Sequence, residues 1–369
     1  MPDIPTIADA SAAALAGFDA VIDVRSPAEF AEDHAPGAVN LWVLDDAQRA
    51  EVGTIYVQQS RFVARRIGAA HVARNIALHL EGALKDAPQD FKPLVYCWRG
   101  GQRSGAMATV LTQVGWRTTV LEGGYSTYRR HVKGRLYDAD LDHQFVLLDG
   151  NTGSAKTAIL GRLGALGIQT LDLEGLAGHR GSLFGAIAGA PQPAQKMFES
   201  RLLSALEALD PSRPVVVEAE SSKVGERMVP PAVWAAMTRA PRIEVTAPAP
   251  ARARYLATAY ADITRDRAAL DDALERLPTP PGRKRLAEWR QMADAGAFED
   301  LAAALIELHY DPAYGRSSRT DARAVLGRIA VEDLSEASQA GAAAEVARIV
   351  GEGLSTNFRS LPPQATELI

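Results

Sequence analysis

The stretch that decides the fold reads Phe145-Val146-Leu147-Leu148-Asp149-Gly150-Asn151-Thr152-Gly153-Ser154-Ala155-Lys156-Thr157. A short apolar run leads into a loop that contains glycines, and a lysine and a threonine then open a helix. A buried strand, a tight loop of backbone N–H donors and a helix N-terminus aimed at an anion are typical of phosphate-binding loops. The sequence therefore predicts a phosphate site made by Gly150, Asn151, Thr152, Gly153, Ser154, Ala155, Lys156 and Thr157.

One residue departs from the usual pattern of such loops, G-x-x-x-x-G-K-[ST]. Gly150, Lys156 and Thr157 match it, but Ala155 occupies the position of the second glycine. Alanine resists a positive φ, so the loop must either hold Ala155 in a right-handed conformation or strain it. An ordinary strand, turn and helix with a surface lysine accounts less well for the same residues. The pattern indicates a polyphosphate ligand, and ATP hydrolysis does not follow from it.

Composition favours a soluble chain with two domains. The chain has 369 residues, which is long for one core, and 47% of them are hydrophobic and 23% charged. No apolar run approaches the roughly 18 residues that a membrane helix needs. The N-terminus shows no basic region followed by a hydrophobic core, as a secretory signal would. We therefore expect a cytoplasmic location and no membrane contact.

The formal net charge of -5 gives no global electrostatic reason to expect nucleic-acid binding. Local basic clusters occur, although each is more often a solvated face than a binding site. They are Arg61/Arg65/Arg66, Arg129/Arg130/Lys133/Arg135 and Arg283/Lys284/Arg285.

The single cysteine, Cys97, excludes an internal disulfide and a cysteine-rich zinc site. An apolar strand over residues 93–96 delivers Cys97 to a loop, and the loop leads into a helix. Backbone N–H groups, Arg99 and Arg103 make this loop positive. Such a setting lowers the pKa of a thiol and exposes it as a thiolate. The same loop would bind a dianionic substrate.

Strands alternate with helices in both halves, which predicts two α/β domains with parallel sheets. In the first half, strands are expected near residues 20–25, 34–41, 93–96 and 118–121, with a polar and basic helical stretch over 46–84. Ser26 as N-cap, Pro27 and Glu29 predict a capped helix. We expect a linker near residues 137–143. The first domain then covers residues 1–137 and contains Cys97. The second covers residues 138–369 and is a phosphate-loop domain with a helical C-terminal part.

Polar residues after the phosphate loop complete the predicted pocket. Residues 168–174 are expected to form a strand that ends in the carboxylates Asp172 and Glu174, and residues 214–222 one that ends in Glu218 and Glu220. Acidic residues at strand ends beside a phosphate loop organise magnesium or its water, although a solvated strand end is an alternative for one of them. A glycine-rich loop with His179, Arg180 and Ser182 is predicted to line the pocket. Arg316 and Arg319 either reach a phosphate or are surface charge.

The first half resembles a rhodanese domain. The resemblance is carried by Asp23-Val24-Arg25-Ser26-Pro27-Ala28-Glu29-Phe30, His34-Ala35-Pro36-Gly37-Ala38-Val39-Asn40-Leu41, the Cys97 loop and Leu121-Glu122-Gly123-Gly124. Rhodanese domains carry sulfur or selenium on a cysteine, or use a related loop for phosphate chemistry. Sulfur-transferring members usually place the loop arginine five residues after the cysteine, whereas Arg103 lies six after Cys97. This C-x5-R-S spacing, found in cysteine phosphatases, makes a wider loop that suits a tetrahedral oxyanion.

Both halves together resemble the tRNA 2-selenouridine synthase family, over nearly the whole chain. The most specific stretch is Asp172-Leu173-Glu174-Gly175-Leu176-Ala177-Gly178-His179-Arg180-Gly181-Ser182-Leu183-Phe184-Gly185. The rest of the resemblance is carried by residues 46–59, 97–104, 122–125, 150–157, 218–221 and 310–312. The family usually has glycine where this chain has Ala155.

The resemblance implies a two-step exchange at the wobble uridine, position 34, of certain tRNAs. A 2-thiouridine is first S-alkylated by geranyl diphosphate, and selenophosphate then supplies selenium while the geranylthiol leaves. By this resemblance the phosphate loop holds geranyl diphosphate and apolar neighbours hold its tail, while Cys97, Arg99 and Arg103 meet selenophosphate. The implied partner is the anticodon loop of tRNA, with Trp98, Tyr125, Tyr128 and the basic clusters as candidates for its recognition. No cofactor is permanently bound. A role for magnesium and a covalent selenium intermediate on Cys97 stay open.

Two rival interpretations compete with this one. The first is a rhodanese-type cysteine phosphatase or sulfurtransferase fused to a nucleotide-binding regulatory domain. The C-x5-R-S spacing supports a phosphatase, but no general-acid Asp lies nearby and Tyr96 precedes the cysteine where histidine is usual. The second is a regulatory nucleotide-binding module with an inactive rhodanese domain.

Overall fold

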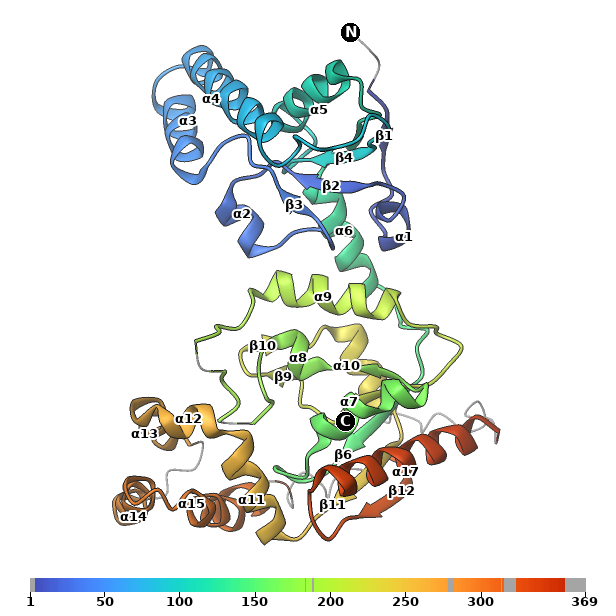
Figure 1. Ribbon diagram of the computed structural model, residues 1–369, viewed down its shortest axis with the longest axis vertical. Coiled ribbons are helices and arrows are strands. Elements are labelled where there is room, and N and C mark those ends of the chain that lie inside the picture. The colour runs from blue at the N-terminus through green and yellow to red at the C-terminus, as the bar shows by residue number, and fades with distance from the viewer. Residues whose placement is uncertain are drawn as a thin grey trace, which may run out of the picture. The chain divides into compact units, whose positions relative to one another are not determined.

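The computed structural model describes residues 4–182, 184–187, 189–277, 282–312, 314 and 323–355. The chain divides into two compact units (Figure 1). The first comprises Met1–Ala139 and Pro193–Glu207, and the second comprises Asp140–Gln192 and Ala208–Ile369. Division into the consecutive ranges 1–137 and 138–369 differs from this result, because a helix from the second half is part of the first unit.

The first unit is built on a five-stranded parallel sheet in the order β1-β5-β4-β2-β3. The strands are β1 (Thr6–Ile7), β2 (Ala20–Asp23), β3 (Val39–Asn40), β4 (Pro93–Tyr96) and β5 (Thr119–Leu121). The middle strand β4 is buried over its whole length, which agrees with its apolar sequence. Because all strands run parallel, β2 and β4 end at one edge of the sheet, and Cys97 follows β4 there.

Helices α1 (Ala12–Leu15), α2 (Pro27–Glu32), α5 (Gln102–Val114) and α6 (Tyr125–Leu136) surround this sheet. The predicted cap of α2 is present: the Ser26 N–H donates to Glu29 Oε2 at 3.2 Å, and Pro27 opens the helix. Side chains of β2, β4 and α5 form one apolar core that includes Ile22, Val95 and Met107. Cys97 is part of that core.

The helical stretch expected over 46–84 is present and consists of two helices, α3 (Asp46–Gln58) and α4 (Arg61–Glu81). The chain turns at Gln59 and Ser60, where the Ser60 hydroxyl accepts from the Val63 N–H and caps α4. The helices then run antiparallel: Asn75 donates to Gln48 Oε1 at 2.7 Å, and His71 contacts Glu51 at 3.1 Å.

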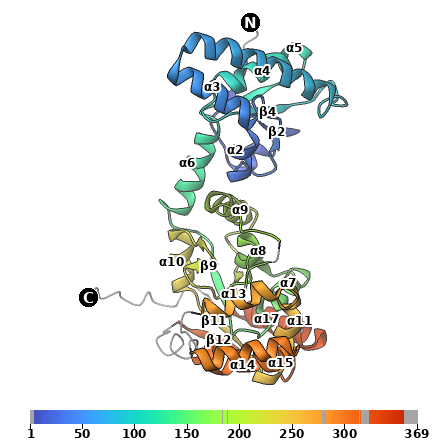
Figure 2. The ribbon, with the colours of Figure 1, turned by 90° about the vertical axis from the view of Figure 1, so that its left-hand side faces the viewer.

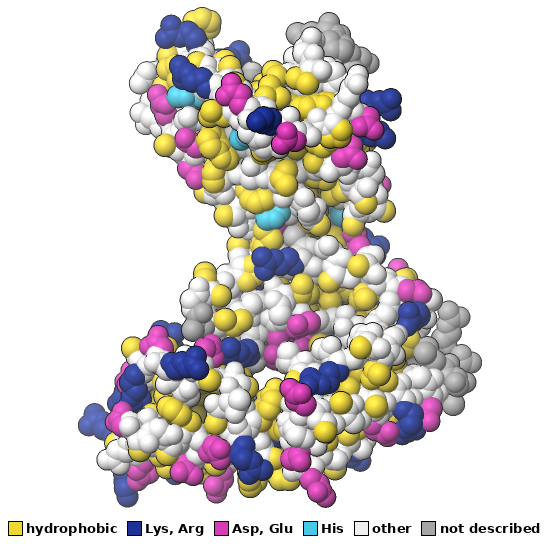
Figure 3. All heavy atoms as spheres, viewed as in Figure 1, with side chains coloured by type: hydrophobic (Ala, Val, Ile, Leu, Met, Phe, Trp, Pro, Cys, Tyr) yellow, Lys and Arg dark blue, Asp and Glu magenta, His cyan; other side chains and the backbone are white. Residues whose placement is uncertain are grey.

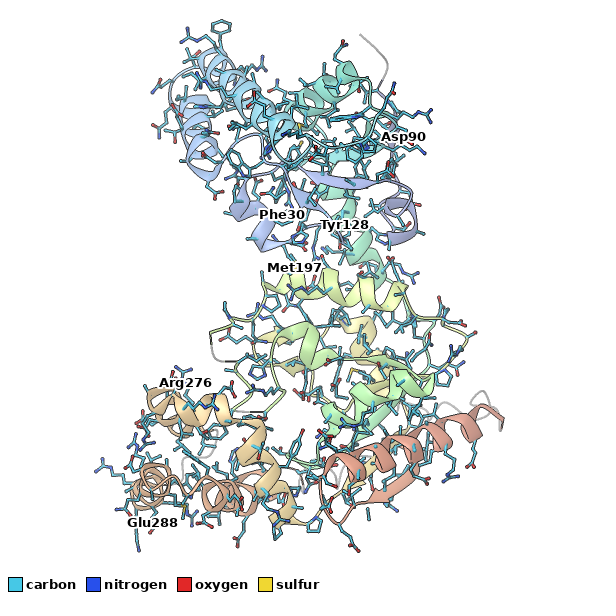
Figure 4. The ribbon with its side chains drawn as sticks, in the orientation of Figure 1. Phe30, Asp90, Tyr128, Met197, Arg276 and Glu288 are labelled. Carbon is cyan, nitrogen blue, oxygen red and sulfur yellow. The ribbon has the colours of Figure 1, made fainter. Side chains whose placement is uncertain are left out.

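Helix α9 (Gln195–Glu207) also belongs to the first unit. Arg129 and Tyr137 both bond Glu199, which is 2% exposed, and His131 lies 2.7 Å from Glu207. The buried Met197 lies on the same helix (Figure 4). A buried carboxylate is stabilised only when it is paired, so these contacts explain why this helix clusters with the first unit.

The second unit is built on another five-stranded parallel sheet, in the order β12-β11-β6-β8-β7. The strands are β6 (Phe145–Asp149), β7 (Gln169–Leu171), β8 (Val215–Glu218), β11 (Arg242–Thr246) and β12 (Val325–Ala330). A short hairpin, β9 (Lys223–Val224) and β10 (Arg227–Met228), follows β8. The helices that pack with this sheet include α7 (Lys156–Leu163), α8 (Leu173–Ala177), α10 (Pro231–Arg239) and α17 (Glu336–Ser355).

Helices dominate the rest of the second unit, as predicted. They are α11 (Ala249–Ala259), α12 (Ala261–Arg265), α13 (Arg267–Glu275), α14 (Arg283–Asp294) and α15 (Phe298–Leu305), followed by the π-helix η2 (Ile306–Tyr310) (Figure 2). Their apolar faces form a second core around Leu274, Trp289 and Leu305. Helices α14 and α15 lie side by side and α11 packs against α15.

Both predicted acidic strand ends are shorter than expected. Strand β7 stops at Leu171, Asp172 caps α8 by accepting from the Gly175 N–H at 2.7 Å, and Glu174 lies in the first turn of α8. Strand β8 stops at Glu218, so Glu220 is not on a continuing strand. None of the described helices is long and apolar enough to cross a membrane.

Candidate functional site

The predicted phosphate loop lies between β6 and α7, where the strand–loop–helix pattern placed it. Lys156 Nζ donates to the Gly150 carbonyl at 2.6 Å, which folds the lysine back over its own loop. Gly150 has φ +154, and a Cβ there would lie 2.4 Å from the Val245 carbonyl oxygen. Gly153 has φ +84, and a Cβ there would lie 2.9 Å from Leu256 Cγ. Both glycines are therefore required by the fold.

Ala155 adopts φ +59 and ψ +28, and it is the one described residue other than glycine with a positive φ. Of the two conformations open to it, the structure adopts the strained, left-handed one. A left-handed alanine costs about 1–2 kcal/mol. Strain of this kind is held where the surrounding structure requires it, often at functional sites.

The loop is tied to α11 by a buried arginine that sequence analysis missed. Arg252 is 3% exposed and donates to both carboxylate oxygens of Asp311, at 2.9 and 2.6 Å, and to the Thr152 carbonyl at 3.2 Å. Asn151 donates to the same carboxylate at 2.8 Å. Asn151 therefore holds the loop in place and is not in the cavity lining.

Two glutamates stand beside the lysine end of the loop. The Thr157 hydroxyl donates to Glu174 Oε2 at 2.9 Å. A Cβ on Gly181 would lie 2.4 Å from Oε1 of both Glu174 and Glu220, so the two carboxylates share one small space. Burial, then the charge of Glu174, raises the pKa of Glu220 to about 8, while Lys156 opposes the rise.

The other two predicted carboxylates have different positions. Glu218 is fully buried, and its Oε2 accepts from the Leu173 N–H at 3.1 Å. Burial, followed by the charges of Asp172 and Glu174, raises its pKa well above the usual range. Neither Glu218 nor Asp172 is in the cavity lining. In the described ranges, no three His, Cys, Asp or Glu side chains are grouped as metal ligands.

The loop opens onto a cavity of about 490 Å³. Tyr255 and Leu256 of α11 and Tyr260, which follows this helix, form one wall, although the sequence contained no motif that could single them out. Predicted site residues in the lining are Gly150, Thr152, Gly153, Ser154, Ala155, Lys156, Thr157, Glu174, Arg180, Ser182 and Glu220.

An apolar pocket of about 60 Å³ adjoins this cavity. Leu256 and Tyr260 line both spaces. Its other walls come from the helical part and from Phe184: Ala257, Ile263, Thr264, Leu270, Phe298, Leu301, Ala302, Leu305 and Tyr310. The site thus offers phosphate donors on one side and hydrocarbon contacts on the other.

The loop after α8 contributes to the wall in part. Arg180 lies 3.0 Å from Asp262 with its guanidinium 5.2 Å from the Tyr260 ring, and the Ser182 hydroxyl is 2.7 Å from the Tyr260 hydroxyl. His179 is not in the lining; burial and then the charge of Arg180 lower its pKa. Leu183, Arg316 and Arg319 lie outside the described residues.

In the first unit, Cys97 lies at the end of β4 and accepts two hydrogen bonds at Sγ. The Ser104 hydroxyl donates at 3.2 Å and the Gly101 N–H at 3.3 Å. Burial raises the pKa of the thiol. The Ser104 hydroxyl and the backbone N–H groups of Ser104, Gly101 and Arg99 outweigh burial, so the pKa is lowered, as predicted. Cys97 is only 4% exposed, however, and the expectation of an exposed thiolate was wrong because β2, β4 and α5 pack around it.

The two predicted arginines differ. Arg103 donates to Glu29 at 2.8 Å, and Arg49 pairs with the same carboxylate at 3.0 Å. Arg103 is therefore neutralised by Glu29, a partner that its position in the motif did not reveal. Arg99 is exposed, and among the described residues its guanidinium has no hydrogen bond or ion pair.

Comparison with known proteins agrees with this architecture. Residues 8–131 match the rhodanese-like domain, and residues 143–276 match the tRNA 2-selenouridine synthase AAA domain. The tRNA 2-selenouridine synthase of Nitrosomonas europaea is 36% identical over 214 residues, which cover 57% of this chain and 55% of that protein. The tRNA 2-selenouridine synthase of Sulfurovum sp. is 31% identical over 343 residues, 84% of this chain and 91% of that protein.

The chain belongs to the tRNA 2-selenouridine synthase family. Both units of the structure correspond to domains of this family. The first is a rhodanese domain with Cys97, and the second is a phosphate-loop domain with a parallel sheet and a helical part. The match to the family's AAA domain spans both the phosphate loop and α11, including Arg252. Asp311, the partner of Arg252, lies beyond that match.

Proposed function

We propose that this protein converts 2-thiouridine at position 34 of tRNA to 2-selenouridine, first by S-geranylation with geranyl diphosphate and then by selenation with selenophosphate. The observation that supports this best is the shape of the second unit's site. A phosphate cavity and an apolar pocket share Leu256 and Tyr260 as a common wall. A ligand with a charged head and a hydrocarbon tail would place its head in the first space and its tail toward the second.

In the first step, the C2 sulfur of the base attacks C1 of the geranyl group. The C1–O bond breaks, its electron pair leaves on diphosphate, and the base loses its N3 proton. The leaving diphosphate is stabilised as charge develops on it by Lys156 and by the loop N–H groups at the start of α7. Thr157 and Glu174 would hold a magnesium ion, which when bound would neutralise further charge on the diphosphate.

In the second step, selenium from selenophosphate bonds to C2, and the C2–S bond breaks to release geranylthiol, which takes up a proton. Water then cleaves the P–Se bond and leaves 2-selenouridine and phosphate. The Cys97 loop supports a role in this step, because its N–H groups and the exposed Arg99 attract an oxyanion. Arg103 would have to release Glu29 before it could contact that anion.

The test is mass spectrometry of tRNA nucleosides after incubation with geranyl diphosphate and then with selenophosphate. Lys156→Ala should abolish S-geranyl-2-thiouridine, whereas the exposed Lys223→Ala should not. Cys97→Ala should accumulate the geranylated nucleoside and form no 2-selenouridine. An unchanged nucleoside mass with the unaltered protein would refute the proposal. Loss of geranylation in Cys97→Ala would refute the division of labour between the two units.

The phosphatase alternative is separated by a chromogenic phosphate ester, with Cys97→Ser as the control. Phosphate release that depends on Cys97, without any change in tRNA, would favour the phosphatase. Tight ATP binding without any effect of Cys97→Ala on tRNA composition would favour a regulatory module.

A further inference from the structure

The outer end of the α3–α4 hairpin exposes large hydrophobic side chains that no other part of the described chain covers. Val57 is 83% exposed, Phe62 is 75% exposed and Tyr56 is 44% exposed. All three lie within a few residues of the turn at Gln59 and Ser60. Side chains of this size exposed together mark an interaction surface rather than a core.

Positive charge surrounds these side chains. Helix α4 carries Arg61, Arg65, Arg66 and Arg74, and its one acidic residue is Glu81 at its last position. Among the described residues, none of the four guanidinium groups has an ion pair or a hydrogen bond, and Arg61 lies 5.5 Å from the Tyr56 ring. This contrasts with a chain whose net charge is -5, and with other described arginines such as Arg25, Arg242 and Arg252, which form ion pairs.

The exposed residues of α4 form one continuous face. They recur in pairs every four positions: Arg61 and Phe62, Arg65 and Arg66, Ala69 and Ala70, Ala73 and Arg74, and Ala77 and Leu78, with Glu81 exposed at the end of the helix. With a rise of about 1.5 Å per residue, the face extends about 20 Å from Arg61 to Arg74. The alanines between the arginines keep the middle of this face low, so a backbone can approach it closely. Figure 3 shows dark blue and yellow side chains together at the upper left, where the hairpin lies.

We infer that this surface, defined by Tyr56, Val57, Arg61, Phe62, Arg65 and Arg66 and called the hairpin tip, binds RNA that presents unpaired bases. Unpaired arginines neutralise phosphates, while exposed aromatic rings stack on bases that have left a helix. The exposed amides of Gln58 and Gln59 add donors and acceptors for base edges. The inference rests on the proposed function only in taking tRNA as the substrate.

Fluorescence anisotropy with a labelled tRNA transcript, titrated at several salt concentrations, tests the charge. Arg61→Ser/Arg65→Ser/Arg66→Ser should weaken binding and reduce the slope of log K against log salt by about 2–3. The matched control Arg283→Ser/Lys284→Ser/Arg285→Ser removes the same charge from exposed positions of α14 and should leave binding unchanged. Equal weakening by the two triple variants would overturn the inference.

Phe62 tests the stacking. Phe62→Ala should weaken binding about tenfold with an unchanged salt slope, and Phe62→Tyr should restore it, whereas Phe62→Leu should not. Rescue by leucine would show that the contact needs only hydrocarbon volume and would overturn the assignment of this surface to unpaired, stacked bases. Binding to anionic lipid vesicles that depends on Phe62, with tRNA affinity unaffected, would do the same.

Failure of this inference is distinguishable from failure of the proposed function. The tip variants should keep the helix content and melting temperature of the parent chain, because all substituted residues are exposed. They should also keep geranyl diphosphate affinity, because the tip residues lie outside the phosphate cavity. If the parent chain binds tRNA and the tip variants bind within twofold of it, the inference is wrong while the proposed function stands. If the parent chain binds no tRNA, both are wrong.

Discussion

Replacing Glu220 by glutamine should change how diphosphate binding depends on pH. The carboxylate lines the phosphate cavity, beside Glu174 and within the field of Lys156, and its pKa is raised to about 8 by burial and by Glu174. Below that pKa the side chain is neutral and does not repel a phosphate ligand. Above it the cavity gains a negative charge, so binding the anion then requires uptake of a proton.

The magnitude follows from this linkage. For the parent chain, log Kd should change little at about pH 7, above the last pKa of the ligand, and should rise above about pH 8 with a slope of up to one. Each pH unit there costs up to tenfold in affinity, or about 1.4 kcal/mol. In Glu220→Gln the side chain is neutral at every pH, so this part of the rise should vanish.

Isothermal titration calorimetry with geranyl diphosphate in EDTA is the assay, because the ligand keeps a constant charge well above its last pKa near 6. The matched control is Glu226→Gln, since Glu226 is 81% exposed and should leave the profile unchanged. Identical pH profiles for the parent chain and Glu220→Gln would refute the argument that the carboxylate pair holds a proton in the cavity.

The free energy of unfolding should also depend on pH through Glu220, and this contribution should fall as the pH rises. A carboxyl whose pKa is raised on folding binds more protons in the folded state between about pH 4.5 and pH 8. Its contribution is present in full below that window and is lost as the pH rises through it. A shift from 4.5 to about 8 corresponds to at most about 5 kcal/mol. Thermal melting of Glu220→Gln should therefore decline less than that of the parent chain over this window.

Three further predictions concern the two loops. Lys156→Ala should weaken geranyl diphosphate binding at least tenfold in calorimetry. The melting temperature should stay close to that of the parent chain, because Lys156 Nζ donates to a carbonyl of its own loop, that of Gly150. Ser104→Ala should raise the pH midpoint of Cys97 alkylation by about 1–2 units, because the substitution removes a hydrogen-bond donor to the thiolate. Mass spectrometry on the single cysteine measures this midpoint, and an unchanged midpoint would contradict the prediction. Ala155→Gly should retain diphosphate binding and Ala155→Val should lose it, because a β-branched residue does not readily adopt φ +59. Equal binding by the two variants would show that the loop does not need that conformation.

Local pattern was sufficient for the parts of this protein that are local. The apolar run, the glycines and Lys156-Thr157 predicted β6, the phosphate loop and α7, because a strand, a loop and a helix in succession depend mostly on neighbouring residues. The same holds for β4 and the Cys97 loop, and for the alternation that predicted two parallel sheets.

Long-range contacts decided the rest, and they leave little trace in any one segment. The pKa of Glu220, which follows β8, depends on Glu174 in α8, and Arg103 is neutralised by Glu29. The wall of the cavity comes from α11, whose sequence has the composition of an ordinary helix. Residue spacing in the sequence could identify the hydrogen-bond donors of a phosphate site. Only tertiary packing determines which charged groups lie beside those donors, because electrostatic and packing energies depend on distance in space rather than along the chain.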